Sequence, residues 1–303
     1  VAPSRGLGDV YKRQMKNRLN GIIEALETGT HVFGTISAPD ISAAVTLSTS
    51  DYDAVILDAE HRPWDVNGIR DSLQYLINRR RVFESDNLSP SVTPLVRIPS
   101  NGGEFSQWHA KQALDMGAYG IVWPHINTVT EARNAVAACR YPRGSNAGLH
   151  EPKDLRGDGP YAAAHYWGIN VAEYYERADV WPLNPEGELI VCIMIESLMG
   201  VENLPSILDE VPGIGLVLTG PADLSQELGV PGQHQHPDVL ECQSRVLEIC
   251  LERGIAVAHA NVTPNNAEEV VNAGYRLLLS SPKEIDLGKD AARRVITERE
   301  KND

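Results

Sequence analysis

The 303-residue chain has little positive charge and little cysteine. It carries 27 Lys and Arg against 41 Asp and Glu, which gives a formal net charge of −14. Because nucleic acids and anionic membrane surfaces attract basic proteins, this balance argues against both as partners. The four cysteines form no Cys-x-x-Cys pair, and we expect them to be reduced packing residues in a cytoplasmic protein.

Three further signals are missing. No apolar run approaches the length needed to cross a bilayer, and no signal peptide is visible. No Gly-x-Gly-x-x-Gly follows the first predicted strand, which weakens the case for a dinucleotide-binding sheet. The hydrophobic content of 42% is ordinary for a globular protein.

Residues 1–14, VAPSRGLGDVYKRQ, do not share the pattern of the rest of the chain. They lack apolar periodicity and precede Met15, after which a helical pattern starts at once. The segment resembles translated adapter sequence, so we expect a non-native or disordered leader. Residues 15–303 are predicted to form a single domain.

From Met15 onward, strand-like apolar runs alternate with amphipathic helices. Alternation of this kind indicates parallel strands joined by right-handed crossovers. Eight such units in about 290 residues favour a closed (β/α)8 TIM barrel over an open doubly wound sheet. The predicted strands cover residues 31–36, 53–58, 93–98, 119–123, 189–195, 215–219, 254–259 and 275–279.

Polar side chains stand where several of these strands end. In a barrel the carboxyl ends of all strands meet at one mouth, where barrel enzymes keep their chemistry. Taken singly, each residue has an ordinary structural explanation, such as a helix cap for the aspartate after the sixth strand. Together they predict a site. They are Asp58, Glu60, His61, Arg97, Glu196 and Asp223.

These residue types suit one kind of chemistry. Two carboxylates on neighbouring strands suit a hard divalent cation, Mg²⁺ or Mn²⁺, with Co²⁺ as a further option. Arg97 offers a fixed fork for a carboxylate or an oxyanion, and His61 can move a proton near neutral pH. A cation, an arginine and a base together suit enolate chemistry on a 2-oxo acid.

Five motifs resemble those of the class II pyruvate aldolases of the HpcH/HpaI type. The resemblance implies a metal-dependent barrel that makes or cleaves 2-oxo-4-hydroxy acids, with pyruvate and an aldehyde as the other partners. The motifs are Leu57-Asp-Ala-Glu-His-Arg-Pro63, Pro94-Leu-Val-Arg-Ile98, Arg140-Tyr-Pro-Arg143, Ile195-Glu196 and Gly220-Pro-Ala-Asp-Leu-Ser225.

The resemblance also implies roles for individual residues. Glu196 and Asp223 would be the metal ligands, and Arg97 would contact the keto oxygen of the substrate. His61 would be the acid/base, oriented by Asp58.

Other residues would bind the rest of the substrate. The turn that begins at Gly220 would hold the pyruvate carboxylate through the backbone N–H groups of Ala222 and Asp223. Trp64 and Trp123 follow or end strands and are predicted to contact the ligand.

Three positions stand somewhat apart from this scheme. Met194 occupies a place where the family commonly has Gln, and strand alternation points it into the barrel with Glu196, which should loosen control of the metal's surroundings. His125 follows the fourth strand and is a weaker candidate for substrate contact. Asp115 matches a family aspartate near a subunit boundary, with a surface helix carboxylate as the alternative.

The family usually assembles as hexamers of swapped dimers through the last helix. We therefore expect a homo-oligomer, with residues 285–295 as the candidate interface. The irregular, aromatic-rich region 141–188 is interpreted as an ordered excursion or lid. Its aromatic side chains either shape the aldehyde side of the pocket or pack on the barrel rim or a neighbouring subunit.

Two alternatives to an aldolase remain. An oxaloacetate decarboxylase, or a relative that traps the enolate in another carbon–carbon bond, would use the same residues because the enolate is common to all of them. A non-catalytic barrel that binds a small acid would be expected to have lost a metal carboxylate or the base, and all are present.

Overall fold

The computed structural model describes residues 18–85, 87–144, 151–280 and 285–301. The predicted leader, residues 1–14, lies outside the described residues.

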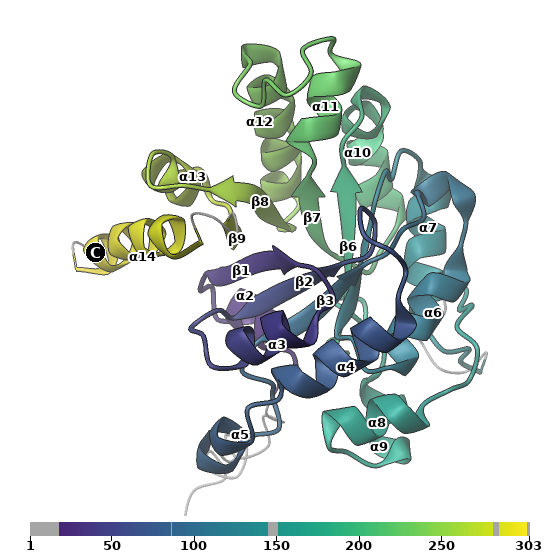
Figure 1. Cartoon of the computed structure of the whole chain (residues 1–303). Coiled ribbons are helices and arrows are strands. Elements are labelled where there is room, and N and C mark those ends of the chain that lie inside the picture. Colours follow the sequence, from purple (N-terminus) through teal and green to yellow (C-terminus); the bar gives the residue numbers. More distant parts are fainter. Residues whose placement is uncertain (1–17, 86, 145–150, 281–284, 302–303) are drawn as a thin grey trace, which may run out of the picture.

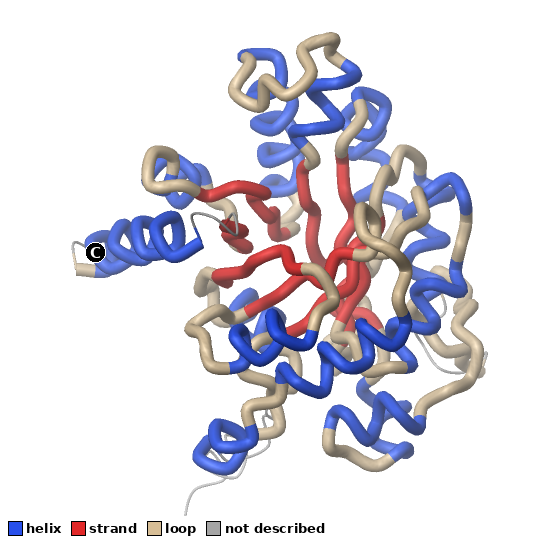
Figure 2. The backbone as a smooth tube through the Cα atoms, in the orientation of Figure 1, coloured by secondary structure: helices blue, strands red, loops and turns tan. Residues whose placement is uncertain are grey.

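Eight parallel strands form a closed barrel at the centre of the molecule (Figure 2). β1 pairs with both β2 and β9, and β4 pairs with β6, so the sheet closes on itself. The two-residue strand β5 (Val180–Trp181) pairs with the start of β6. The predicted barrel is therefore confirmed. Its strands are β1 (Val32–Ser37), β2 (Ala54–Asp58), β3 (Thr93–Arg97), β4 (Gly120–Trp123), β6 (Leu189–Ile195), β7 (Ile214–Thr219), β8 (Ala256–Val262) and β9 (Leu277–Ser280).

Helices surround the barrel, and several begin at a polar cap, as their sequences require. Asp40, Asp65 and Ser197 each accept a backbone N–H of the helix that follows, and Thr128 forms a capping box with Glu131. The helices are α2 (Gly21–Glu27), α3 (Ile41–Ser48), α4 (Val66–Leu76), α5 (Arg79–Ser85), the 3-10 turn η1 (Gly102–Glu104), α6 (Gln107–Asp115), α7 (Val129–Ala138), α8 (Tyr161–Trp167), α9 (Val171–Arg177), α10 (Leu198–Glu210), α11 (Pro221–Glu227), α12 (Pro237–Glu252), α13 (Ala267–Ala273) and α14 (Ile285–Glu300).

Strand alternation divides the core into two layers. The side chains inside the barrel form one cluster, which Ile22 and Ile23 of α2 close at the end where the strands begin. The side chains on the outer face of the strands pack against the helices in a second cluster. Met194 belongs to the inner cluster, as predicted. The other inner residues contributed by the strands include Ile56, Leu95, Val122, Cys192 and Leu218.

The same alternation corrects one prediction. Because Val122 faces the barrel interior, its neighbour Trp123 must face outward. The indole is 0% exposed and packs between the barrel and the helices. The prediction that Trp123 contacts substrate is therefore wrong.

The aromatic excursion packs at the end of the barrel where the strands begin. α8 and α9 lie side by side there, away from the tips of β6 and β7 (Figure 1). Trp167 stacks on Tyr119 with ring centroids 4.6 Å apart, and its indole N–H donates to Gly117 O at 2.8 Å. Tyr119 directly precedes β4. The described part of the excursion thus packs on the barrel rim, which is one of the two interpretations, while residues 145–150 lie outside the described residues.

Asp115, at the end of α6, lies at this same end of the barrel. Its carboxylate forms an ion pair of 2.9 Å with the buried guanidinium of Arg156, so it is more than a bare surface carboxylate. Its predicted position near a subunit boundary stays a prediction.

The last helix packs on its own chain. α14 contacts α13 and the strands β8 and β9 and lies beside α13 in Figure 1. Lys289 and Arg293 of α14 form ion pairs with Asp51. The exchange of this helix between subunits stays a prediction.

All four cysteines are free thiols, and three of them are buried, as expected for packing residues. Within the part of the chain that the structure describes, no helix combines the length and apolar character needed to cross a bilayer.

Candidate active site

Asp58 and Arg97 lie together because they are the last residues of β2 and β3 and are direct partners in the strand register. Arg97 Nε donates to Asp58 Oδ1 at 2.9 Å. Nη1 of the same guanidinium lies 2.8 Å from Glu60 Oε2. All three side chains are nearly buried, so the arginine is held between two carboxylates with little screening by water.

The contacts of His61 differ from the expected ones. Asp58 Oδ1 accepts the backbone N–H groups of Glu60 and His61, at 3.1 and 3.5 Å. The His61 ring is 67% exposed, and its Nε2 lies 3.5 Å from Glu60 Oε2. Asp58 therefore holds the backbone of the loop, whereas Glu60 is the carboxylate beside the ring. The structure therefore differs from the prediction that Asp58 orients the imidazole, because the contacts of Asp58 in this loop are to its backbone and Glu60 lies beside the ring.

Glu196 follows β6 and is buried at the centre of the mouth. Its Oε1 accepts the backbone N–H of His125 at 2.7 Å, and Nε2 of the His125 ring lies 3.7 Å from the same oxygen. His125 has a φ of 48°, in the left-handed region that histidine adopts more readily than most residues. In this conformation the backbone N–H and the ring Nε2 both lie near Glu196 Oε1, and such strain is often found at functional sites.

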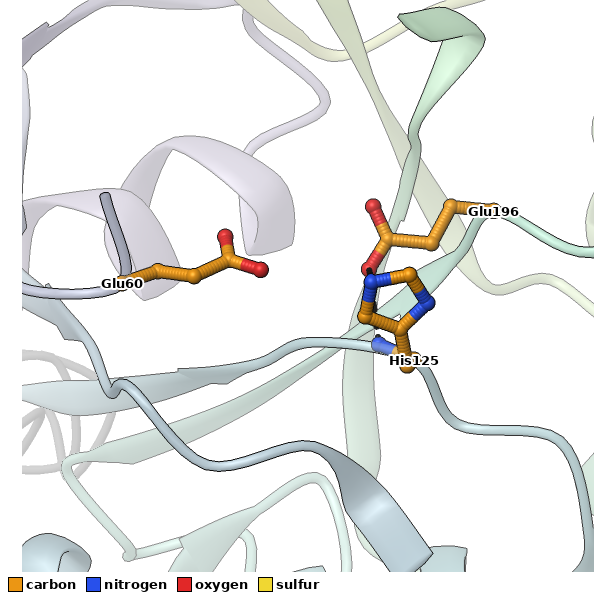
Figure 3. A group of neighbouring side chains, drawn as sticks. All are labelled: Glu60, His125 and Glu196. Atoms are coloured by element: carbon orange, nitrogen blue, oxygen red, sulfur yellow. Dashed lines mark hydrogen bonds and ion pairs between the residues drawn. The ribbon is translucent and has the colours of Figure 1, made fainter. Parts of the chain in front are cut away.

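Glu60, His125 and Glu196 form a group that can hold a metal ion. One ligand atom from each lies within 4.8 Å of the others, and the carboxylate of Glu60 points toward the other two side chains (Figure 3). Two carboxylates and an imidazole are donors that divalent cations accept.

Two local features fit a cation here. Glu60 Oε2 is buried, and among the described residues its contacts are the ion pair with Arg97 Nη1 at 2.8 Å and the approach of His61 Nε2 at 3.5 Å, with no hydrogen bond of good geometry. A side chain at Gly220 would place its Cβ 2.3 Å from Glu196 Oε2, so the glycine leaves that oxygen its space. The buried acceptor and the open space beside Glu196 are what a ligand set needs.

The raised pKa values of Glu196 and Glu60 also favour a cation at this group. Burial raises the pKa of Glu196 to about 7, and the nearby charges of Glu60 and Asp223 add to this, whereas His125 opposes it. Burial likewise raises the pKa of Glu60, against the opposing charge of Arg97. Carboxylates that lose water without gaining a full counter-charge hold their protons more tightly. The site therefore favours the arrival of positive charge.

The other predicted residues follow β7 and β2. Asp223 is partly buried in the first turn of α11, close enough to influence Glu196 but outside the group of three. Ala222 is exposed beside it. Trp64 packs edge-on against His109 at 4.7 Å, and its indole N–H donates to Gln112 of α6. Its contact with substrate stays a prediction.

Sequence reasoning placed Glu60 at the mouth but gave it no role, and treated His125 only as a weak substrate contact. The signal for Glu60 was its position two residues after Asp58, directly beside the predicted base. The signal for His125 was a histidine two residues past a strand end. Only the closure of β4 against β6 brings it to Glu196.

Comparison with known proteins agrees with this geometry. The HpcH/HpaI aldolase/citrate lyase family matches residues 33–279. The chain belongs to this family. It is 29% identical to a hydroxypyruvate/pyruvate aldolase of Roseobacter denitrificans over 86% of this chain and 90% of the relative. It is 32% identical to a 2-keto-3-deoxy-L-rhamnonate aldolase of Salmonella dublin, over 84% of each.

A solved structure supports the same assignment. An HpcH/HpaI aldolase/citrate lyase family protein from Burkholderia cenocepacia J2315 superimposes with a TM-score of 0.71 at 29% identity. The alignment covers 93% of this chain and 99% of that one. The predicted family is confirmed, and with it the enzyme class, an aldolase or lyase of the class II pyruvate type.

Proposed function

We propose that this member of the family is a divalent-cation-dependent aldolase that cleaves or forms 2-oxo-4-hydroxy acids, with pyruvate and an aldehyde as the partners. The observation that carries the proposal is the group of Glu60, His125 and Glu196 beside the buried Arg97. A cation and a guanidinium at one barrel mouth are suited to the negative charge that develops on a 2-oxo acid.

Glu196 would hold the cation, with Glu60 and His125 as the donors grouped with it. Asp223, the second ligand that the family resemblance implies, lies close enough for its charge to influence Glu196. When bound, the cation supplies Lewis-acid stabilisation for charge that develops on the substrate oxygens. The raised pKa of Glu196 fits this role, because binding a cation would displace the proton that burial retains.

The chain's own groups bind and orient the substrate. Arg97 is held at the strand end by Asp58 and Glu60, and its guanidinium would contact the keto oxygen. The first bond within α11 runs from the N–H of Leu224 to the carbonyl of Gly220, at 3.1 Å. The N–H groups of Ala222 and Asp223 come before it and have no partner within the helix, so they would bind the substrate carboxylate.

His61 would move the proton to and from the hydroxyl group of the aldol. Its ring is exposed at the mouth, so a substrate can reach it. The carboxylate of Glu60, 3.5 Å from Nε2, would hold the ring in position for this transfer.

The names of the relatives do not identify one aldehyde partner. Both names describe aldolases, but one specifies hydroxypyruvate and pyruvate and the other 2-keto-3-deoxy-L-rhamnonate. We therefore propose pyruvate as the constant partner and leave the aldehyde to be found by screening. Assembly as a homo-oligomer is proposed on the family resemblance alone, and light scattering after size-exclusion chromatography tests it.

The first experiment is exchange of the pyruvate methyl protons in D2O, followed by NMR with Mn²⁺ or Mg²⁺ and then with EDTA. We expect exchange that needs the cation and is lost in the Glu196→Gln variant. Exchange that persists in EDTA, or in that variant, would contradict the metal assignment. Absence of exchange with every cation would contradict the aldolase proposal, and an oxaloacetate assay would then distinguish a decarboxylase from a barrel that only binds a small acid.

A further inference from the structure

A cavity lies at the end of the barrel opposite the candidate active site. It is lined by the residues just before β1 and β9, by the ends of α12 and α13, and by the last turns of α14. Its volume of about 540 Å³ is in the range of pockets that bind small molecules. None of the residues assigned to the active site lines it.

The charge of this cavity is opposite to that of the chain. Its lining includes Arg276, Arg293 and Arg299, and the single carboxylate among the described residues that line it is Glu300. The whole chain, by contrast, carries a net charge of −14. A local concentration of guanidinium groups in an acidic protein requires an explanation beyond average composition.

Arg276 and Arg299 are available to a ligand. Arg293 is not, because it forms an ion pair with Asp51, which lies outside the lining. Arg276 donates to the backbone carbonyl of Gly29, and Arg299 reaches the side-chain oxygen of Asn272 at 3.5 Å. Neither forms an ion pair with a carboxylate in residues 18–85, 87–144, 151–280 or 288–301, whose side chains the structure describes.

The charges of Arg276 and Arg299 also act on a histidine that lines the cavity. His31, just before β1, has its pKa lowered to about 4, first by burial and then by the charges of Arg276 and Arg299. The histidine is therefore neutral at pH 7, and the potential that opposes its protonation would favour an anion.

The remaining wall is apolar. Phe33, Leu251, Val271 and Ile296 line it, and the guanidinium of Arg293 lies over the Phe33 ring at 4.6 Å from its centroid. A bare ion would leave this surface unused, whereas an anion attached to a carbon body would cover it.

We propose that this cavity binds a small organic anion, with a phosphate or carboxylate group between Arg276 and Arg299 and its carbon body against the apolar wall. Arg276 precedes β9, and Arg299 belongs to the last turn of α14. An anion bound between them would tie the last helix to the floor of the barrel. The site would thus link a metabolite other than the substrate to the position of α14.

The test is isothermal titration of the full chain with two probes, inorganic phosphate and citrate, in EDTA and at constant ionic strength. The variants are Arg276→Gln with Arg299→Gln, and as matched control Arg294→Gln, an exposed arginine of the same helix that does not line the cavity. We expect the double variant to lose at least about tenfold in affinity for the preferred probe, and the control to match the wild type. The preferred probe identifies the head group.

The proposal is overturned by equal affinity in wild type, the double variant and the control, by no binding of either probe, or by heats that sodium chloride reproduces. The Glu196→Gln variant should bind the probe as the wild type does, so binding lost there would mean that the probe occupies the active site instead. If the double variant does not fold, the single change Arg299→Gln, on an exposed side chain, makes the same comparison.

Discussion

The pH dependence of stability in the metal-free protein should depend on Glu196. Burial, with the charges of Glu60 and Asp223, raises its pKa from 4.5 to about 7. The folded protein therefore holds this proton more tightly than the unfolded chain. The contribution to stability is fully present below the unfolded pKa and is lost as the pH rises through the folded pKa. A shift of this size corresponds to about 3 kcal/mol in full, at about 1.36 kcal/mol per unit.

The assay is urea unfolding in EDTA at about pH 5 and about pH 8. Glu196→Gln keeps the shape of the side chain but cannot ionise, so we expect wild type to lose about 2 kcal/mol more than the variant between these two pH values. Glu248→Gln, on an exposed position of α12, is the matched control and should behave like wild type. The comparison of variants removes the contribution of the other titrating groups.

Addition of Mn²⁺ at the higher pH extends the test. A cation at about one hundred times its dissociation constant adds about 2.7 kcal/mol of stability to a protein that binds it only when folded. We expect this gain in wild type and in the Glu248→Gln control, and its loss in Glu196→Gln. If wild type and Glu196→Gln lose stability in parallel in EDTA, the argument from a buried, uncompensated carboxylate is refuted.

Three further changes test neighbouring parts of the site. Gly220→Ala would place a Cβ 2.3 Å from Glu196 Oε2, and we expect the Mn²⁺ affinity measured by titration to fall by about tenfold or more; an unchanged affinity would contradict the geometry. His61→Ala should lower kcat for aldol cleavage by about 10² or more while the Kd for pyruvate stays nearly constant, so equal losses in both would argue against a proton-transfer role. His125→Asn removes an imidazole that suits borderline cations, and competition titration should show a larger loss for Co²⁺ than for Mg²⁺; equal losses would exclude His125 as a nitrogen donor.

The barrel was predictable because its pattern is local. Each strand is a short apolar run with a helix after it, and such alternation has few compact solutions. The position of Asp58 and Arg97 at one mouth also followed, since both end neighbouring strands, whereas their direct contact was not predicted. The described helices α8 and α9 had no such signal, because their short aromatic segments bury against the rim rather than against the barrel strands.

Errors at the site have physical causes as well. The face of Trp123 follows from a period of two, and a count from Val122 would have placed the indole outside the barrel. The role of His125 was not readable in this way. Its backbone takes a left-handed conformation, and its partner Glu196 lies 71 residues away, joined to it only by the pairing of β4 with β6.

The excursion between β4 and β6 has a practical consequence for handling the protein. It departs from and returns to the end of the barrel where strands begin, while catalysis is proposed at the other end. Tyr161 is 75% exposed on its surface. A fluorophore or a surface tether attached at that position would report on or immobilise the enzyme without obstructing the opening through which substrates arrive. The barrel thus has one end suited to attachment and an opposite end that is left free for substrates.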